Sequence, residues 1–281
     1  MLYHSGIILG RLAGIEVRLH WSFLLAAGWF FQDGFDLIGL VLYGVLFTSV
    51  LLHELGHCFA ARSVGGRADS IVLWPLGGVA YTEANRGNVM DSVWISLAGP
   101  LVNLLLALAC AAGLWGQGYG LQPGDFWPLD FEPSGQLTSS MGVGLFLVLK
   151  LQMMLFCFNV MLPAYPLDGG QALASLLSLV IPLQTNSLVM AGITTLAAVG
   201  LWSQHEVFLA VFLGIQVPTL LGPASDFHPL AHFYNRPAVI EGKAPVYQAP
   251  GLQLRPCPQC GEKLHPESEL CSNCGQKYPF V

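Results

Sequence analysis

The stretch of sequence that decides the fold is residues 37–60, LIGLVLYGVLFTSVLLHELGHCFA. Residues 37–52 carry no charged side chain, and the whole stretch is long enough to cross a bilayer as a helix of about 20 residues. The apolar run then meets three ionisable residues within five positions, His53, Glu54 and His57. Ionisable groups are costly inside a membrane and usually serve a function there, so this stretch predicts a transmembrane helix that carries a functional site.

The composition of the whole chain also indicates a membrane protein. Of the 281 residues, 54% are hydrophobic and 10% are charged, whereas a soluble domain carries about 25% charged residues. So few charges exclude an ordinary cytosolic enzyme, and so much apolar sequence excludes a disordered protein. The net charge of -6 comes with no basic face, so no nucleic-acid partner is expected.

Hydrophobic stretches of similar length recur along the chain and predict a polytopic α-helical membrane protein with about six transmembrane helices. The first stretch is the weakest, because Asp33 and Asp36 end it early. It is not expected to be a cleaved signal peptide, because it lacks a basic opening and a small-residue cleavage site. The six predicted spans are 19–35, 37–60, 92–116, 141–163, 185–202 and 206–222.

Two segments predict a small membrane-associated β element. Residues 14–19 alternate polar and apolar side chains, which is the period of a strand. Residues 70–80 are apolar but are interrupted by proline and glycine, which favours a hairpin or a re-entrant loop over a helix. A non-helical apolar segment at membrane depth must be shielded by protein or water, so residues 70–80 are expected to line a cavity.

The lysines and arginines predict the orientation in the membrane. With the N-terminus in the cytoplasm, ten of the eleven fall on the cytoplasmic side, and the opposite loop, 117–140, holds none. Both termini are therefore expected in the cytoplasm. The exception is Lys150, inside the fourth predicted span, which we expect to face a polar cavity or to bend toward an interface.

The spacing of His53 and His57 is typical of a metal site on a helix. Residues four apart lie on one face, so both imidazoles can bind one ion, and zinc favours such ligands. Glu54 is adjacent in the sequence and can act as general base toward a water molecule at the metal. The alternative is a polar packing cluster without a metal.

A catalytic zinc ion usually has a third protein ligand and an open position for water. The candidate is Asp168, at the end of the fourth predicted span. Pro163 and Pro166 interrupt the helix before it, and Gly169 permits close backbone approach after it. The predicted topology brings Asp168 to the same side of the membrane as the histidine pair. The alternative role for Asp168 is to cap a helix or stabilise a turn.

With these residues in place, the sequence resembles the site-2 protease family of intramembrane zinc metalloproteases, and within it the six-span bacterial branch. The resemblance covers about residues 8–222 and implies a location in a bacterial cytoplasmic membrane. It rests on five motifs in a fixed order, which are 14–21 (GIEVRLHW), 53–57 (HELGH), 76–80 (LGGVA), 98–103 (AGPLVN) and 163–170 (PAYPLDGG).

The resemblance implies roles for individual residues. Zinc would be held by His53, His57 and Asp168, with Glu54 as the base. An asparagine before the aspartate motif would lie near the scissile carbonyl, and Asn159 is the matching residue. Asn159 stands four positions before the first proline of that motif, where the family more often has three.

Two further positions follow from the resemblance. An unwound substrate is expected to add as a strand along the edge of residues 71–80, where Gly77 and Gly78 would contact it. The alternative is that this segment only plugs the cavity. The family usually has arginine after the two glycines of the aspartate motif, and Gln171 stands there. We expect that difference to alter a cytoplasmic contact and not the zinc.

The C-terminal residues predict a second, structural zinc site. Two Cys-x-x-Cys-Gly knuckles are typical of a closed four-cysteine zinc ribbon, and a reducing cytoplasm disfavours disulfides there. The predicted domains are an intramembrane metalloprotease domain (1–222), a proline-containing linker (223–254) and the ribbon (255–281). The ribbon would serve recognition or regulation through a cytoplasmic partner, and its predicted ligands are Cys257, Cys260, Cys271 and Cys274.

These predictions combine into one function. The chain is expected to be an intramembrane zinc endopeptidase that cuts a membrane-anchored protein in or near a transmembrane segment, with the lipid bilayer as its other partner. One alternative is a non-catalytic scaffold that binds transmembrane segments and presents the ribbon, against which an intact Glu54 argues. Another is a transporter with a metal-binding gate, against which the charge-poor spans argue.

Overall fold

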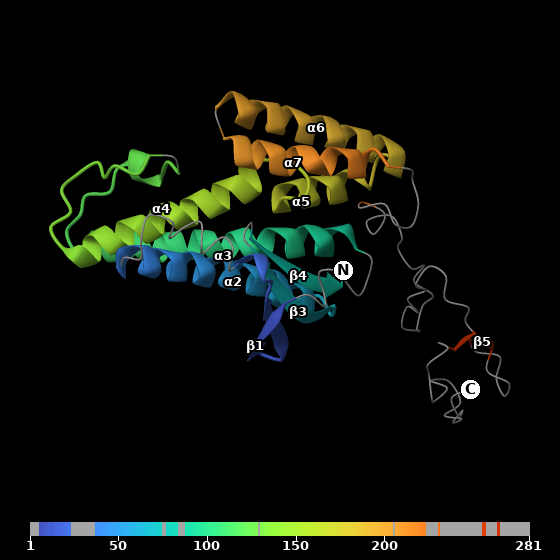
Figure 1. Ribbon diagram of the computed structural model, residues 1–281, viewed down its shortest axis with the longest axis horizontal. Helices are drawn as coiled ribbons and strands as arrows, with labels where there is room; N and C mark the ends of the chain where they lie inside the picture. Colours follow the sequence, from blue (N-terminus) through green and yellow to red (C-terminus); the bar gives the residue numbers. More distant parts are fainter. Residues whose placement is uncertain are drawn as a thin grey trace. The chain divides into compact units, whose positions relative to one another are not determined.

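The computed structural model describes residues 6–23, 37–74, 77–83, 88–128, 130–204 and 206–222, with residue 230 and the short segments 255–256 and 263–264. The chain divides into two compact units, Met1–Arg236 and Pro237–Val281. In the first unit a small sheet packs against a group of helices (Figure 1). In the second, the described residues form a two-stranded sheet of β5 (Arg255–Pro256) and β6 (Lys263–Leu264). The predicted boundaries at residues 222 and 254 remain predictions.

Four of the described helices are long and apolar enough to cross a membrane. They confirm the spans predicted at 37–60, 92–116, 141–163 and 185–202. These helices are α2 (Leu37–Ser63), α3 (Val89–Gly116), α4 (Ser140–Met161) and α6 (Leu183–Ser203).

The two remaining predicted spans have a different outcome. Span 19–35 lies for the most part outside the described residues. Span 206–222 forms α7 (Val207–Leu220), a helix of 14 residues. At 1.5 Å per residue α7 is about 21 Å long, which is less than the hydrocarbon core of about 30 Å. The described residues therefore support four full-length spans, and the total of six is not confirmed.

The sheet confirms the predicted strand at 14–19 and the predicted hairpin at 70–80. Its order is β1-β2-β3-β4, with antiparallel pairs at both ends and a parallel pair of β2 and β3 in the middle. The parallel pair needs a long connection, and α2 lies within it. The strands are β1 (Ile7–Leu12), β2 (Ile15–Leu19), β3 (Arg67–Trp74) and β4 (Gly77–Glu83).

The turn between β1 and β2 shows how local sequence sets this sheet. Leu12 pairs with Ile15, so the loop has two residues, Ala13 and Gly14. Their φ angles are 50° and 78°, and positive φ at both positions is the signature of a type I′ hairpin turn. Glycine adopts that conformation without strain, which favours the tight connection.

An apolar core joins the sheet to the C-terminal part of α2, the part that carries His53 and His57. Side chains of β2 and β3 meet Leu55 and Cys58 of α2, and burying them removes apolar surface from solvent. On its other side α2 packs closely on α3: a Cβ at Gly56 would lie 2.8 Å from the carbonyl oxygen of Ala98. The buried residues of this core are Ile15, Val17, Leu55, Cys58, Ala68, Ile71 and Leu73.

Helix α3 lies at the centre of the helices and packs against α2, α4 and the short helix α5 (Asp168–Leu177). Helices α6 and α7 lie side by side (Figure 1). Helix α6 also contacts α5. The aspartate motif is therefore held between the central helix and the α6–α7 pair.

The loop between α3 and α4 is organised by a buried polar group, the loop cluster of Tyr119, Asp125 and Lys150. Asp125 accepts hydrogen bonds from the backbone N–H of Gln122 at 2.7 Å, that of Ser134 at 3.0 Å and the Tyr119 hydroxyl at 3.1 Å. Burial raises the pKa of the Asp125 carboxyl, but these donors outweigh it and the pKa is lowered overall.

Lys150 is fully buried on α4 and belongs to the same cluster. Its Nζ donates to the carbonyl oxygens of Gly124 at 3.2 Å and Trp127 at 3.0 Å, and it lies 5.1 Å from the centre of the Phe146 ring. The Lys150 side chain thus stabilises the loop between α3 and α4. This loop includes the 3₁₀ turn Pro123–Phe126. Lys150 was expected to face a polar cavity or to bend toward an interface. The polar groups that its ammonium contacts are main-chain carbonyl oxygens of this loop.

Candidate metal centre

His53 and His57 lie on one face of α2, as their spacing predicts, and both are buried. Their Nε2 atoms are 3.1 Å apart, and the ring planes are nearly perpendicular at 79°. Two imidazoles therefore direct the same atom into one small space.

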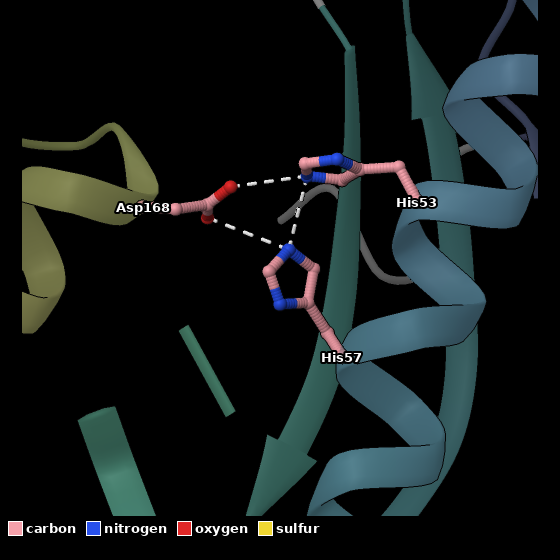
Figure 2. A group of neighbouring side chains, drawn as sticks. All are labelled: His53, His57 and Asp168. Carbon is pink, nitrogen blue, oxygen red and sulfur yellow. Dashed lines mark hydrogen bonds and ion pairs between the residues drawn. The ribbon is translucent and has the colours of Figure 1, made fainter. Parts of the chain in front are cut away.

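Asp168 enters that space from α5, of which it is the first residue (Figure 2). Its Oδ2 lies 3.0 Å from His53 Nε2, and its Oδ1 lies 3.4 Å from His57 Nε2. The prediction that Asp168 meets the histidine pair is confirmed in its geometry.

The chain reaches this position because two glycines allow the backbone to fold tightly after the prolines. A Cβ at Gly170 would collide with the carbonyl group of Ala164, and one at Gly169 would lie 2.7 Å from the Val160 carbonyl oxygen. Side chains at either position would push α5 away from the end of α4 and move Asp168 with it.

The outer nitrogen of each imidazole is also held. His57 Nδ1 lies 2.6 Å from the main-chain carbonyl oxygen of Ile95, and His53 Nδ1 lies 2.5 Å from Asn103 Oδ1. A main-chain oxygen only accepts, so His57 donates from Nδ1 and, in the neutral ring, has a lone pair at Nε2. Such outer hydrogen bonds are typical of histidines that bind metals.

The donor set fits a zinc ion. Zinc binds imidazole nitrogen and carboxylate oxygen at about 2.0–2.2 Å in tetrahedral geometry, which separates neighbouring ligand atoms by about 3.3 Å. Here the two Nε2 atoms are 3.1 Å apart, and each has its own carboxylate oxygen of Asp168 nearby, Oδ2 at 3.0 Å from His53 and Oδ1 at 3.4 Å from His57. Among the described residues Asp168 Oδ2 is buried and receives no hydrogen bond. A carboxylate oxygen without a donor, facing two nitrogens, indicates a site for a cation.

The space for that cation depends on Gly99 of α3. A Cβ at this position would lie 2.7 Å from His53 Nε2 and would collide with the ring of His57. Gly99 thus forms the wall of the site opposite α2. A glycine is needed at this position because the α3 backbone lies so close to the two imidazoles.

Glu54 is buried next to the histidine pair and faces strand β4. A Cβ at Gly78 would lie 2.7 Å from Glu54 Oε1, so the β4 backbone runs directly against the carboxylate. Gly77, with φ 141°, begins the same strand and pairs with Trp74. Within the described residues β4 pairs only with β3, which leaves its outer edge without a strand partner.

The other predicted site residues have different surroundings. Asn159 donates from Nδ2 to the carbonyl oxygen of Leu155 in its own helix, at 3.0 Å. Gln171 donates to the carbonyl oxygen of Pro166, at 3.0 Å, and so stabilises the turn before Asp168. The four predicted ribbon ligands, Cys257, Cys260, Cys271 and Cys274, lie outside the described residues.

Three residues beside the site were not assigned a role by the sequence. Asn103 belongs to a quoted motif, whereas Ser49 and Gln152 do not. The structure links all three to His53 by hydrogen bonds. The available signal was weak: Ser49 precedes His53 by four positions, and Gln152 is a lone amide in an apolar span.

Comparison with known proteins agrees with this site. Residues 41–124, which include the histidine pair and Gly99, match the model of peptidase family M50. The chain is 31% identical over 179 residues to a zinc metalloprotease of Methanocaldococcus jannaschii, an alignment that covers 61% of this chain and 45% of that protein. It is 28% identical over 184 residues to Rip3 of Mycobacterium tuberculosis, covering 59% and 42% respectively. The chain thus spans less than half the length of these curated relatives.

The fold is similar to that of a solved structure, the site-2 protease from Methanocaldococcus jannaschii. The TM-score is 0.54 at 26% sequence identity, and the match covers 79% of this chain and 97% of that one. The structural match thus covers a larger share of the chain than residues 41–124, the segment that the family model matches.

Proposed function

We propose that the chain is a member of the site-2 protease family of intramembrane zinc metalloproteases, peptidase family M50, and that it hydrolyses peptide bonds in or near a transmembrane segment of a membrane-anchored protein. One observation carries the proposal. His53, His57 and Asp168 direct three ligand atoms into one buried space beside Glu54, at the end of a membrane-spanning helix.

The metal would be held by His53 Nε2, His57 Nε2 and the Asp168 carboxylate. When bound, zinc supplies the Lewis acidity that polarises a carbonyl group and makes water acidic enough to lose a proton near neutral pH. Glu54 would act as the general base that takes a proton from the attacking water and as the general acid that returns it to the leaving amine. Its burial against β4 keeps the carboxylate fixed and excludes bulk water, which favours proton transfer to a single partner.

We propose that the substrate lies along the outer edge of β4. A transmembrane helix has all its backbone groups paired, so it must unwind locally before it can be cut. The unwound segment can recover hydrogen bonds by pairing with the edge of β4 that has no strand partner among the described residues, and Gly78 would bring it against Glu54. Asn159 would contribute a donor near the scissile carbonyl after releasing its bond to Leu155.

The orientation and the tail complete the proposal. Both termini are assigned to the cytoplasm from the distribution of lysine and arginine, and cysteine labelling should find residue 65 accessible from the cytoplasm and residue 130 from outside.

We also propose that the four C-terminal cysteines bind a structural zinc ion. Cys257→Ser should lower the zinc content from two ions per chain to one and leave peptide hydrolysis by the internal site in place.

The central test is Glu54→Gln in the full-length protein. The variant should bind zinc as the wild type does, because the ligands are unchanged, and should lose at least about 100-fold in cleavage rate of a reconstituted transmembrane substrate. Zinc content and cleavage are measured on the same preparation. Cleavage at the wild-type rate would refute the protease proposal, and a substrate that binds to both proteins without being cut would favour the scaffold.

A further inference from the structure

A line of buried polar side chains runs through the helices behind His53. Ser49 lies on α2, Asn103 on α3 and Gln152 on α4, and each is at most 3% exposed. We call these three residues together with His53 the His53 network. Polar groups of this kind are expensive in an apolar bundle unless they pair with one another, so their arrangement is informative.

The distances connect the network without a gap. Ser49 Oγ lies 2.7 Å from the carbonyl oxygen of Val45, and Gln152 Nε2 lies 2.6 Å from Ser49 Oγ. Asn103 Nδ2 lies 2.7 Å from Gln152 Oε1. Asn103 Oδ1 in turn lies 2.5 Å from His53 Nδ1.

The direction of every bond is set at one end by a main-chain atom. The Val45 carbonyl oxygen only accepts, so the single hydrogen of the Ser49 hydroxyl is used there. Ser49 Oγ must therefore accept from Gln152, which turns the Gln152 amide so that its oxygen faces α3. That oxygen only accepts, so Asn103 gives it an N–H and leaves its own oxygen facing His53.

The last bond decides the state of the imidazole. Asn103 Oδ1 has no hydrogen, so His53 must donate from Nδ1. A neutral imidazole then has its lone pair on Nε2, the atom that faces His57 and Asp168. With the opposite direction of the bonds, Asn103 would present an N–H to His53 Nδ1, and the proton would sit on Nε2, where it would block a metal.

We propose that Ser49, Gln152 and Asn103 are positioning residues that fix His53 as the tautomer protonated at Nδ1 and so prepare Nε2 as a metal ligand. The network also joins α2 to α4, the helix that leads into the segment bearing Asp168. This inference rests on the proposed function, because it takes the ion at the site to be the zinc of that function.

The experiment compares full-length variants of the network for zinc affinity, by competition with a chelator, and for the tautomer of His53, by ¹⁵N NMR of histidine-labelled metal-free protein. The C-terminal cysteines are unchanged in every variant, so the part of the zinc titration that moves reports the internal site. Asn103→Leu should weaken zinc binding about 10–100-fold and populate the other tautomer. Asn103→Asp keeps an acceptor toward His53 Nδ1 and should retain zinc affinity within a few-fold.

That pair separates positioning from packing. If Asn103 only filled space, leucine, which is apolar and similar in size, would be tolerated at least as well as aspartate. Equal zinc affinity of Asn103→Leu and wild type would overturn the inference, and so would an equal loss in both variants.

A second pair decides the matter if the Asn103 variants do not fold. Ser49→Ala removes the anchor of the network and should weaken zinc binding about fivefold, the equilibrium equivalent of one hydrogen bond. Thr48→Ala is the matched control, because its hydroxyl bonds the carbonyl oxygen of Gly44 in the same way but lies on the exposed side of α2. Equal zinc affinity and an unchanged tautomer in the two variants would refute the role of Ser49. Failure of the wild type itself to bind zinc at the internal site would instead refute the proposed function.

Discussion

The metal centre and the loop cluster are both buried polar groups in an apolar bundle, yet their atoms are satisfied in opposite ways. Around Asp125 two backbone N–H groups and a hydroxyl donate to the carboxylate. Around Asp168 two imidazole nitrogens face the carboxylate, and Oδ2 receives no hydrogen bond among the described residues. Of these two buried aspartates, the one whose Oδ2 lacks a donor is the one that faces two imidazoles, which is the arrangement expected of a metal ligand.

The two groups even share a helix. Lys150 and Gln152 are two residues apart on α4. Side chains with this spacing point to opposite sides of a helix. Lys150 serves the loop through main-chain carbonyls, and Gln152 serves His53 through Asn103. The loop cluster therefore lies on one side of α4 and the metal centre on the other. Variants of the loop cluster should change stability, and variants of the metal centre should change zinc binding.

The largest effect is expected at Asp168. Asp168→Ala removes a ligand from a site with three, so the internal zinc should be lost and cleavage should fall to background. Compared in the metal-free state, the two proteins should differ little in free energy of unfolding, because Asp168 Oδ2 has no hydrogen bond to lose. Metal analysis, cleavage and denaturation in detergent check the three statements, and internal zinc retained at the wild-type level would contradict the assignment of Asp168.

The next effect is expected at Gly99. Gly99→Ala places a methyl group 2.7 Å from His53 Nε2, in the space reserved for the ion, and should weaken zinc binding on the order of 100-fold. Gly116→Ala is the control on the same helix, because nothing lies within 4 Å of a Cβ there. Zinc titration of both variants measures the difference, and identical affinities would mean that α3 does not wall the site.

A smaller effect, of a different kind, is expected at Lys150. Lys150→Met keeps the apolar length of the side chain but removes the ammonium donor from the carbonyl oxygens of Trp127 and Gly124, the second of which still accepts from the Trp127 N–H. The free energy of unfolding should fall by about 1–3 kcal/mol, with zinc content unchanged. Loss of zinc in this variant would show that the two polar groups are coupled through α4.

The smallest expected effect is the loss of loop stability at acidic pH, through Asp125. The pKa of Asp125 is lowered in the folded protein, so its contribution to stability is present above the unfolded pKa of about 3.9 and is lost as the pH falls through the folded pKa. Proteolysis of the loop 117–139 should therefore increase only below about pH 4. Asp125→Asn should make this cleavage less dependent on pH, and an unchanged pH profile would exclude Asp125 as its origin.

Much of the fold and the site could be predicted from local sequence. Long apolar runs predict α2, α3, α4 and α6, because burial of a helix in lipid is decided within the segment itself. The same argument fails for residues 206–222, where the apolar run is present but the helix has 14 residues. Hydropathy measures the preference for lipid and not the length over which the backbone remains helical.

By itself, the sequence determined the nature of the site. The spacing of His53 and His57 follows from helical periodicity, and the prolines and glycines around Asp168 predict a tight turn at a helix end. Tertiary structure alone decided which polar residues of distant helices meet. Ser49, Asn103 and Gln152 join His53 although 49 residues separate Asn103 from Gln152 and 103 separate Gln152 from Ser49. Hydrogen bonds between helices depend on packing and on the direction of each side chain, and no local pattern in the sequence records either.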